Sequence, residues 1–284
     1  MSILDGRQVK IQILKELKEK LLKLNESIGL VVIQIGDDAA SSVYVRQKNK
    51  MATDLNYKFQ HIKLPSNIKE DELLKIIENL NNDDAVDGIL VQMPIPKHLD
   101  ANKVQNSILS CKDVDGLTDI NAGMLVHNKD GLIPCTPMGI IDLLDHYNIP
   151  IEGKNVVIIG RSNLVGKPLA NLMTNKNATV TLCHSKTNNL PFYTNNADIL
   201  VASVGIPNFI TEDMVKPGAV IIDVGINRLP DGSLCGDVDF ASVKEKASYI
   251  TPVPGGVGQM TVAELAVNTY KAHTLHKSLT KQGK

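Results

Sequence analysis

A lysine at the border of an apolar helix face is the strongest candidate for acid–base chemistry in this sequence. The sequence predicts a helix that is capped by Ser41 or Ser42 and runs to about Leu55. At about 100° per residue, Lys48 falls at the edge of its apolar side, one turn beyond Tyr44. The residues predicted on that side are Val43, Tyr44, Gln47, Met51 and Leu55. A half-buried amine loses hydration, which lowers its pKa and suits it to proton transfer near neutral pH. Spacing alone favours the simpler interpretation, in which Lys48 covers apolar surface with its stem.

Gln92 and Asp115 occupy two further positions that suit ligand binding. Gln92 ends a predicted buried strand, residues 88–92, at the carboxyl end where open α/β sheets build their ligand sites. Its amide can donate to and accept from a catalytic group, although an ordinary strand end is an equally good interpretation. Asp115 could accept paired hydrogen bonds from an amino-substituted ring, but an Asx-turn before Gly116 is the commoner use of such a residue. The spacing of these carboxylates indicates no metal site.

A strand followed by a turn of small residues indicates a dinucleotide site. The apolar run 156–159 leads into Gly160, Arg161 and Ser162, and a helix opens at Gly166 after Val165. This order places the backbone close to a pyrophosphate and directs a helix N-terminus at it. The usual fingerprint has glycine where Ser162 stands, so an ordinary strand–helix turn remains the alternative.

The residues after the next strand favour NADP over NAD. NAD enzymes usually place an acidic residue near the adenosine ribose. Here His184 and Ser185 are followed by Lys186 and Thr187, a cationic and hydroxyl set that suits a ribose 2′-phosphate, although a plain polar loop has the same composition. The segments 223–227, which includes Ile226, and 251–258 are predicted to form further walls of the cofactor site or plain return loops.

The elements that must position these residues alternate along the chain, which predicts an α/β fold with parallel strands and crossover helices. The predicted strands are 30–35, 57–64, 88–92, 155–159, 179–183, 199–202 and 219–224. The predicted helices are 9–24, 42–55, 70–80, 137–147 with Pro137 at its first position, 167–174 and 261–276. The polar segment 106–137 is expected to be an irregular join between two domains.

Composition excludes several classes of protein. The 284 residues carry a formal net charge of -1 and no tryptophan, which argues against nucleic-acid binding. Four scattered cysteines (Cys111, Cys135, Cys183 and Cys235) lack CxxC spacing and fit a reducing compartment without a zinc site or disulfide frame. Charged residues interrupt the N-terminal segment, and no apolar run is long enough for a bilayer. We therefore expect a cytoplasmic protein with no metal, membrane or nucleic-acid partner.

Taken in order, these segments resemble the bifunctional methylenetetrahydrofolate dehydrogenase/methenyltetrahydrofolate cyclohydrolase family over nearly the whole chain. The resemblance rests on Tyr44-Val45-x-x-Lys48, Val86-Asp87-Gly88-Ile89-Leu90-Val91-Gln92-Met93-Pro94, Lys112-Asp113-Val114-Asp115-Gly116, Pro134-Cys135-Thr136-Pro137, Gly160-Arg161-Ser162 with Val165-Gly166-Lys167-Pro168, His184-Ser185-Lys186-Thr187, Asp223-Val224-Gly225-Ile226-Asn227 and Thr251-Pro252-Val253-Pro254-Gly255-Gly256-Val257-Gly258. Each piece alone is weak, but their order together is specific.

The resemblance implies an architecture and a reaction. It implies a three-layer α/β catalytic domain at 1–136, completed by a C-terminal helix at 262–284, and a Rossmann-like NADP-binding domain at 137–261. It implies oxidation of 5,10-methylenetetrahydrofolate with NADP and hydrolysis of the methenyl product to 10-formyltetrahydrofolate. Homodimers are usual in the family.

The resemblance also implies roles for individual residues. Lys48 matches the catalytic lysine, Gln92 the residue that orients it, Tyr44 the ring that stacks beside the folate, and Asp115 the pterin anchor. The cofactor residues implied are Gly160, Arg161, Ser162, Val165, Gly166, His184, Ser185 and Ile226. The loop Pro254, Gly255 and Gly256 is implied to border substrate and nicotinamide.

The sequence departs from the family pattern at three positions, and two other functions compete with this one. Relatives often have a basic residue at the positions of Met124 and Met138, and a proline at the position of Gln259. These differences are expected to affect local substrate contacts. A monofunctional dehydrogenase would keep the cofactor turn without needing Lys48. A non-catalytic NADP-sensing protein would bind cofactor and leave Lys48, Gln92 and Asp115 without a joint purpose.

Overall fold

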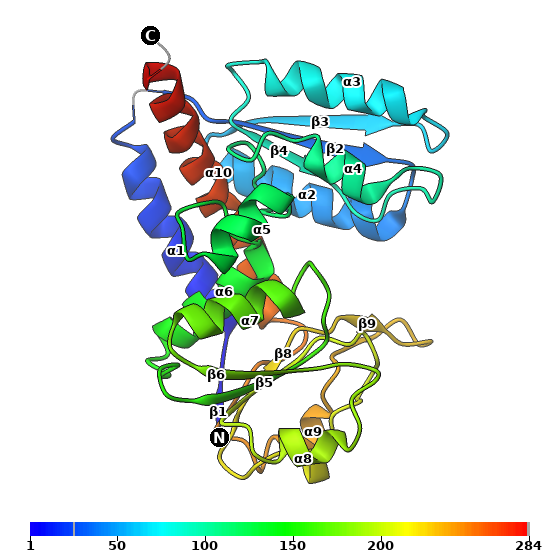
Figure 1. Cartoon of the computed structure of the whole chain (residues 1–284), viewed down its shortest axis with the longest axis vertical. Coiled ribbons are helices and arrows are strands. Elements are labelled where there is room, and N and C mark those ends of the chain that lie inside the picture. The colour runs from blue at the N-terminus through cyan, green and yellow to red at the C-terminus, as the bar shows by residue number, and fades with distance from the viewer. Residues whose placement is uncertain (25, 283–284) are drawn as a thin grey trace. The chain divides into compact units, whose positions relative to one another are not determined.

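The computed structural model describes residues 1–24 and 26–282, with backbone alone at 39, 40 and 279–282. The chain forms two compact units, each assembled from two separate stretches (Figure 1). Unit 1 comprises Met1–Ile13 and Cys135–Glu264, and unit 2 comprises Leu14–Pro134 and Leu265–Lys284. Met1–Ile13 therefore belongs to unit 1, whereas the family resemblance implies that it forms one domain with the rest of 1–136.

Unit 2 is built on a three-stranded parallel sheet in the order β3-β2-β4. Its strands are β2 (Gly29–Ile35), β3 (Lys58–Leu64) and β4 (Gly88–Val91). Every residue of β2 and β4 is buried, as expected for strands covered on both faces, whereas the edge strand β3 is largely exposed. The predicted strands of this unit are therefore confirmed.

Helices cover both faces of this sheet, which gives unit 2 three layers (Figure 1). Residues 31, 33, 35, 89 and 91 face a core formed with α3 (Glu70–Asn81) and α4 (Ala101–Asn106). The other face meets the C-terminal part of α10 (Val257–Gln282), where the Tyr57 hydroxyl donates to the Ala266 carbonyl over 3.0 Å. On that face Gly88 leaves no room for a Cβ between Val114, Leu30 and Thr269.

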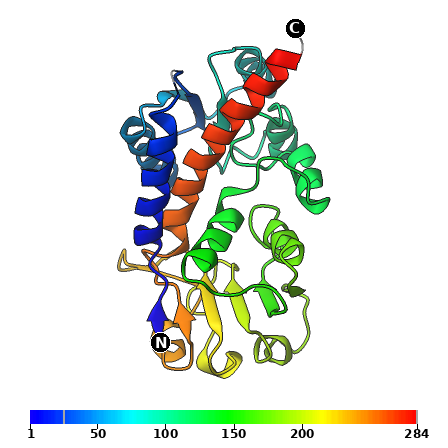
Figure 2. The ribbon, with the colours of Figure 1, turned by 90° about the vertical axis from the view of Figure 1, so that its left-hand side faces the viewer.

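Unit 1 contains a six-stranded parallel sheet in the order β1-β11-β8-β7-β5-β6. Its strands are β5 (Asn155–Ile159), β6 (Thr179–Cys183), β7 (Ile199–Ala202), β8 (Val220–Asp223), β11 (Tyr249–Ile250) and β1 (Ser2–Ile3). Figure 2 shows β1, in blue beside the N label, alongside β11. The chain runs from β5 outward to β6 and then returns past β5 to β7, which is the strand order of a doubly wound sheet with its switch point between β5 and β7.

Helices lie on both faces of this second sheet as well. Helices α6 (Cys135–His146) and α7 (Gly166–Asn175) cover one face, while α8 (Leu190–Thr194) and α9 (Phe240–Val243) cover the other (Figure 1). Alternate strand residues, including Val157, Leu200 and Ile221, point into the core on the α8 and α9 side. The remaining elements are η1 (Glu212–Met214) and the small hairpin of β9 (Asn227–Arg228) and β10 (Leu234–Cys235).

Four helices differ from the predictions in an informative way. Helix α1 covers Gly6–Leu21, and α2 covers Ala39–Asp54 with Asp38, rather than Ser41 or Ser42, as its N-cap. The Asp38 carboxylate accepts from the Ser41 amide over 2.7 Å. Asp38 is therefore the capping residue, and Ser41 lies in the first turn of the helix, where its amide is capped. The segment expected to be irregular contains α5 (Asp119–Val126), and α6 begins two residues before Pro137.

Candidate active site

Lys48 and Gln92 form a direct hydrogen bond in unit 2. The Lys48 ammonium nitrogen lies 2.8 Å from Gln92 Oε1, and both side chains are half-buried. Gln92 Nε2 donates to the Met93 carbonyl over 2.8 Å. Because the nitrogen end of the amide is held by a backbone acceptor, its oxygen end must face the lysine. The pair predicted from two distant motifs therefore meets, with a defined amide orientation.

The elements of unit 2 explain this encounter. Gln92 follows β4, and its backbone amide donates to the Ile33 carbonyl, which extends the pairing of β4 with β2. On α2 the buried stripe contains Ser41, Val45, Ala52 and Leu55, so Lys48 lies on the stripe one turn beyond Val45. The predicted apolar side was wrong for Val43, Tyr44 and Gln47, which are exposed because Val45 is the residue that turns inward.

Tyr44 remains available at the surface of unit 2. Its side chain is 39 % exposed, and it stands one turn before Lys48 on α2. A ring with an open face next to an amine can stack on a flat ligand, since aromatic side chains offer large contact area at low entropic cost. The geometry is thus compatible with the predicted role of Tyr44.

The two aspartates after Lys112 differ in environment. Asp113 is fully buried, and its carboxylate accepts from the Thr118 amide, Gln105 Nε2 and Asn121 Nδ2. Asp113 also takes part in a backbone turn, since its carbonyl accepts from the Gly116 amide over 2.9 Å. Asp115 is only half-buried, so its carboxylate can reach a ligand.

Lys112 is also buried, and it is structural rather than reactive. Its ammonium group donates to the carbonyls of Leu80 and Asp83 at the end of α3, over 3.2 Å and 2.8 Å. Burial lowers the pKa of Lys112, but the two carbonyls accept from two of its three N–H donors. This lysine closes a helix end and leaves Lys48 as the better candidate for proton transfer.

The turn after β5 in unit 1 is tightly packed by glycines. Gly160 has φ +122°, and a Cβ there would overlap the Ser203 carbonyl oxygen. A Cβ at Gly166 would overlap the Gly160 carbonyl oxygen. Ser162 Oγ accepts from the Val165 amide over 3.1 Å, which replaces part of the turn that a glycine usually forms. Only glycine fits at 160 and 166, and the turn carries the first residues of α7 toward any bound anion.

The side chains around this turn are free to meet a ligand. Arg161 and Ser162 are exposed in the turn itself, and Ser185 is exposed after β6. His184 is half-buried, and its Nδ1 accepts from the Lys186 amide over 3.1 Å. The His184 ring therefore shapes the turn, while Ser185, Lys186 and Arg161 supply the donors and charge that a phosphate would need.

Two buried carboxylates fix the loops at the carboxyl end of this sheet. Asp237 is fully buried and accepts from the amides of Val204, Gly205 and Ile206, which follow β7. Asp223, at the end of β8, accepts from the amides of Gly225, Asp237 and Val238. Burial, followed by the charge of Asp237, raises the pKa of Asp223 to about 6 against the effect of its backbone donors.

Sequence reasoning missed Asp237 entirely. Asp237 and Asp239 flank Val238, the same spacing as Asp113 and Asp115, but the role of Asp237 depends on loop amides more than thirty residues away. Its Oδ1 also accepts from Asn227 Nδ2 over 2.9 Å, which holds the loop that carries Ile226. Ile226 is 47 % exposed, so it presents an apolar side chain at this end of the sheet.

The proline–glycine loop of unit 1 has a packing partner within the same unit. The Gly6 amide donates to the Gly255 carbonyl over 3.0 Å, and a Cβ at Gly6 would overlap the Gly256 carbonyl oxygen. Gly255 has φ +118° and is buried with Gly256, whereas Pro254 is exposed. The glycines therefore let the start of α1 approach, and Pro254 is the part of the loop that is open to a ligand.

Within residues 1–24 and 26–282, no three His, Cys, Asp or Glu side chains gather as a metal would require. Over the same residues, no helix combines the length and apolarity of a membrane span.

Unit 1, with its glycine turn at the switch point of a doubly wound sheet, is a dinucleotide-binding module, and unit 2 holds a hydrogen-bonded lysine–glutamine pair. The chain is therefore of the class of two-unit α/β enzymes that use a dinucleotide.

Comparison with known proteins narrows this class to a family. Residues 4–115 match the model of the tetrahydrofolate dehydrogenase/cyclohydrolase catalytic domain, and residues 134–277 match that of the NAD(P)-binding domain. The chain belongs to the tetrahydrofolate dehydrogenase/cyclohydrolase family. The family resemblance inferred from the motifs is thereby confirmed.

Relatives match along nearly their whole length. The chain is 53 % identical to the bifunctional protein FolD of Wolinella succinogenes over 277 residues, 96 % of each chain. It is 50 % identical to that of Bacillus subtilis over 275 residues, 95 % of this chain and 97 % of the relative. The crystal structure of FolD from Campylobacter jejuni has a TM-score of 0.95 at 47 % identity, covering 97 % of this chain and 99 % of that one.

The structure of a more distant relative was solved with a bound dinucleotide. FolD from Trypanosoma brucei, solved with NADP cofactor and an inhibitor, has a TM-score of 0.92 at 34 % identity. The match covers 97 % of this chain and 98 % of that one. The predicted α/β architecture, with a catalytic and an NAD(P)-binding part, is confirmed by these matches.

Proposed function

We propose that this enzyme oxidises 5,10-methylenetetrahydrofolate with NADP and hydrolyses the methenyl product to 10-formyltetrahydrofolate. The family models and the bifunctional relatives support both activities. The single observation in this structure that carries the proposal is the 2.8 Å hydrogen bond between Lys48 and Gln92. A dehydrogenase without a hydrolase step would have no need for an amine oriented in this way.

The hydrolysis step is assigned to Lys48 with Gln92 as its positioning residue. Water adds to the carbon of the methenyl bridge, and the Lys48 amine in its unprotonated form accepts the proton that the water releases. The same group then returns a proton to the ring nitrogen as the carbon–nitrogen bond breaks, so the charge on Lys48 is restored to its starting value. Because Gln92 Oε1 holds one N–H of Lys48, the lone pair is directed away from Gln92 and toward the reacting water.

The folate is proposed to bind beside this pair. Asp115 is half-buried, and its carboxylate offers two acceptor oxygens to the paired N–H groups of an aminopterin ring. The open ring of Tyr44 stacks on the substrate one helical turn from Lys48. Pro254, Gly255 and Gly256 are proposed as additional residues that border the bound ligands.

The residues of unit 1 fit an NADP molecule. The missing Cβ atoms at Gly160 and Gly166 let the backbone approach a pyrophosphate, and Val165 leads into the N-terminus of α7. When bound, NADP supplies the nicotinamide ring that accepts the hydride. Arg161, Ser162 and Ser185 are proposed to hold its phosphates, with His184 shaping their loop.

The remaining cofactor contact is proposed for Ile226, on the loop that follows β8. Ile226 is proposed to pack against the cofactor, since its side chain is exposed on a loop that Asp237 holds in place. The absence of an acidic residue among His184, Ser185, Lys186 and Thr187 supports NADP rather than NAD.

The cellular setting and assembly complete the proposal. Four free cysteines fit a reducing compartment, and we propose the cytoplasm. A homodimer is proposed because β3 is an exposed edge strand of a short sheet, which offers unpaired backbone groups to a second copy. Light scattering on a size-exclusion column measures the mass of the assembly.

The decisive assay measures each activity alone. Purified protein is mixed with methylenetetrahydrofolate and NADP, and the appearance of NADPH is followed at its nicotinamide absorbance, then repeated with NAD. Hydrolysis of methenyltetrahydrofolate is followed separately without any dinucleotide. If NADP is reduced but methenyltetrahydrofolate is not hydrolysed, the protein is a monofunctional dehydrogenase. If NADP binds and neither reaction occurs, the protein is an NADP sensor.

A further inference from the structure

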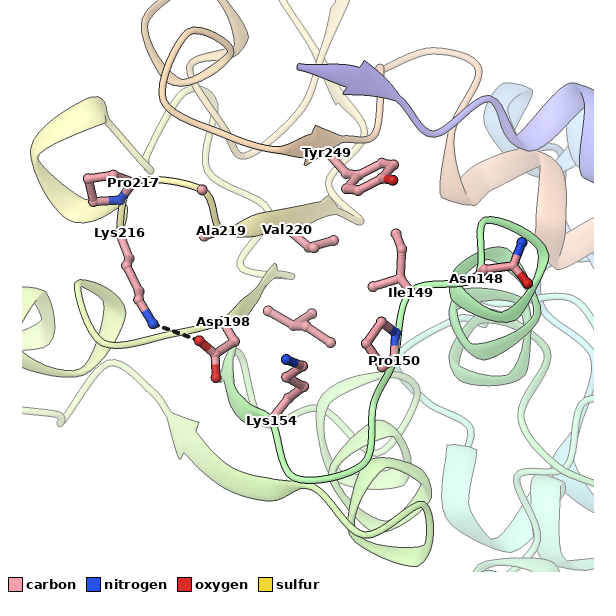
Figure 3. Close-up of a pocket in the computed structure, with 12 residues that line it drawn as sticks. Asn148, Ile149, Pro150, Lys154, Asp198, Lys216, Pro217, Ala219, Val220 and Tyr249 are labelled. Atoms are coloured by element: carbon pink, nitrogen blue, oxygen red, sulfur yellow. Dashed lines mark hydrogen bonds and ion pairs between the residues drawn. The ribbon is translucent and has the colours of Figure 1, made fainter.

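A pocket of about 370 Å³ lies at the end of the unit 1 sheet opposite the dinucleotide turn. It is lined by the residues that precede strands β5, β7 and β8, together with Tyr249 of β11 (Figure 3). The dinucleotide turn follows β5, so the two sites lie at opposite ends of the same strands. This pocket therefore has no part in the proposed reaction, and the inference below does not depend on that reaction.

The walls of the pocket are fixed by backbone hydrogen bonds. The Asp198 amide donates to the Asn155 carbonyl over 2.8 Å, and the Val220 amide donates to the Asp198 carbonyl over 2.9 Å. Gly218, with φ +80°, lies in a turn in which the Ala219 amide donates to the Lys216 carbonyl. The cavity is thus preformed by the sheet, as ligand sites usually are.

The lining of the pocket mixes apolar and charged side chains, and its charged groups sum to one positive charge. Ile149, Pro150 and Val220 form apolar walls, and Tyr249 adds an aromatic ring (Figure 3). The charge of Lys216 is matched by Asp198, whose Oδ1 lies 2.6 Å from its ammonium nitrogen.

Lys154 supplies the remaining charge. Lys154 is half-buried as a residue, and its ammonium group has no hydrogen bond or ion pair to any of the residues that the structure describes. Figure 3 shows this group directed into the space between Asp198 and Pro150. The hydrogen bond from Lys216, with smaller contributions from the Asn155 amide and the charges of Lys216 and Lys154, lowers the pKa of Asp198, so the aspartate stays ionised and paired. The net charge of the pocket is therefore that of Lys154.

We propose that this pocket binds a small organic monocarboxylate with a flat apolar body. The carboxylate pairs with Lys154, and the body lies among Ile149, Pro150, Val220 and Tyr249. A single net charge matches a monoanion, and the apolar side chains that line part of the pocket favour a hydrocarbon ring over a hydrated sugar or polyphosphate. The volume, about 370 Å³, suits a ligand of one or two fused rings.

The proposal is tested by binding of 2-naphthoate to the full chain held with saturating NADP. Binding is measured by calorimetry and mapped by NMR of methyl groups labelled in Ile, Val and Ala residues. We expect saturable binding with shifts at Ile149, Ala219 and Val220. The neutral 2-naphthamide, which has the same shape, should bind about tenfold more weakly or worse because it lacks the charge that Lys154 pairs with.

Matched variants assign the charge. Lys154→Met keeps the length of the side chain and should weaken 2-naphthoate about tenfold without changing 2-naphthamide, whereas Lys154→Arg should retain binding. Lys176→Met, which removes a lysine paired with Asp145 elsewhere in unit 1, is the control and should bind as the parent does. The proposal would be overturned if the acid and the amide bound with equal affinity, or if Lys154→Met bound 2-naphthoate as tightly as the parent does. It would also be overturned if the NMR shifts were confined to residues outside the pocket.

Discussion

The two candidate sites are built by opposite means. In unit 2 the reactive group is a side chain, Lys48, oriented by a second side chain, Gln92, which comes from a different element. In unit 1 the turn at Gly160 and Gly166 is defined by the main chain, and its side chains Arg161 and Ser162 are exposed. A side-chain site concentrates its chemistry in one or two atoms, whereas a main-chain site spreads recognition over several amides and a helix end.

This difference predicts how each site responds to substitution. Removal of the Lys48 amine should slow a chemical step strongly and leave the fold intact, because the residue is only half-buried on α2. A side chain added at Gly160 should distort the turn and reduce cofactor binding without touching the proton chemistry of unit 2. The following changes are ordered from the largest expected effect to the smallest.

Lys48→Met should lower the rate of methenyltetrahydrofolate hydrolysis by about 10²–10⁴-fold, the usual contribution of a positioned acid–base group. The stem of the side chain is retained, so thermal unfolding and NADP binding should match those of the parent. Lys50→Met, an exposed lysine two residues along the same helix, is the matched control. Full hydrolysis by Lys48→Met with its fold intact would show that another group moves the proton.

Gly160→Ala should weaken NADP binding about tenfold or more, because alanine is strained at φ +122° and its Cβ would meet Ser203. Gly153→Ala is a matched control, since Gly153 has φ +71° but nothing within 4 Å of an added Cβ. Affinity is measured by NADPH fluorescence, and hydrolysis without dinucleotide should persist. If both variants lower the affinity for NADP equally, the close contact of residue 160 with Ser203 is not the cause of the weaker binding.

Arg161→Gln should reduce the ratio of kcat/KM with NADP to that with NAD by about tenfold, as expected for loss of one charge-assisted contact to a phosphate. Arg228→Gln serves as the comparison, because the Arg228 guanidinium donates to the Gly232 carbonyl within its own hairpin. An unchanged ratio for Arg161→Gln would place phosphate selection on Ser185 and Lys186 instead.

Glu264→Gln should alter stability and neither activity. Burial, with the neighbouring Asp142 charge, raises the pKa of Glu264 to about 9, so the folded protein holds a proton that the unfolded chain releases near its ordinary value of 4.5. Stability of the parent should therefore fall as pH rises from about 4.5 to about 9, and level off above that range. Glutamine keeps a donor toward Asp142 without a titrating proton, so the variant should be more stable at pH 8 by about 1–3 kcal/mol.

Urea unfolding at pH 5 and pH 8 measures this effect, with the exposed Glu152→Gln as control. The gain should be larger at pH 8 than at pH 5. A uniform change at both pH values would mean that the proton on Glu264 is not linked to folding.

Most regular elements were predictable, because their hydrophobic period is local. Strands β2, β5 and β7 are mostly apolar, and the glycine turn at 160 is encoded within a dozen residues. Helix α5 was missed because Asn121 and Gly123 suggest a loop, whereas the Thr118 hydroxyl caps it by accepting from the Asn121 amide. Strand β1 has two residues and no period to detect.

The sites were predictable only in part, for the same reason. Motif spacing identified Lys48 and Gln92 but could not place them together, since 44 residues separate them and the β2–β4 register decides their distance. Asp237 could not be found at all, because its partners are loop amides whose position depends on the finished sheet. Side chains that act through long-range packing leave little trace in a local pattern.

The pairing of β1 with β11 has a consequence for assembly of the molecule. Ser2 and Ile3 join Tyr249 and Ile250, so the cofactor-type sheet gains its last strand only after almost the entire polypeptide has been synthesised. Closing so long a loop is entropically slow, and the edge of β11 stays bare until it happens. A bulky fusion attached directly before Ser2 would compete with this closure, whereas the same fusion on a flexible spacer would leave it undisturbed.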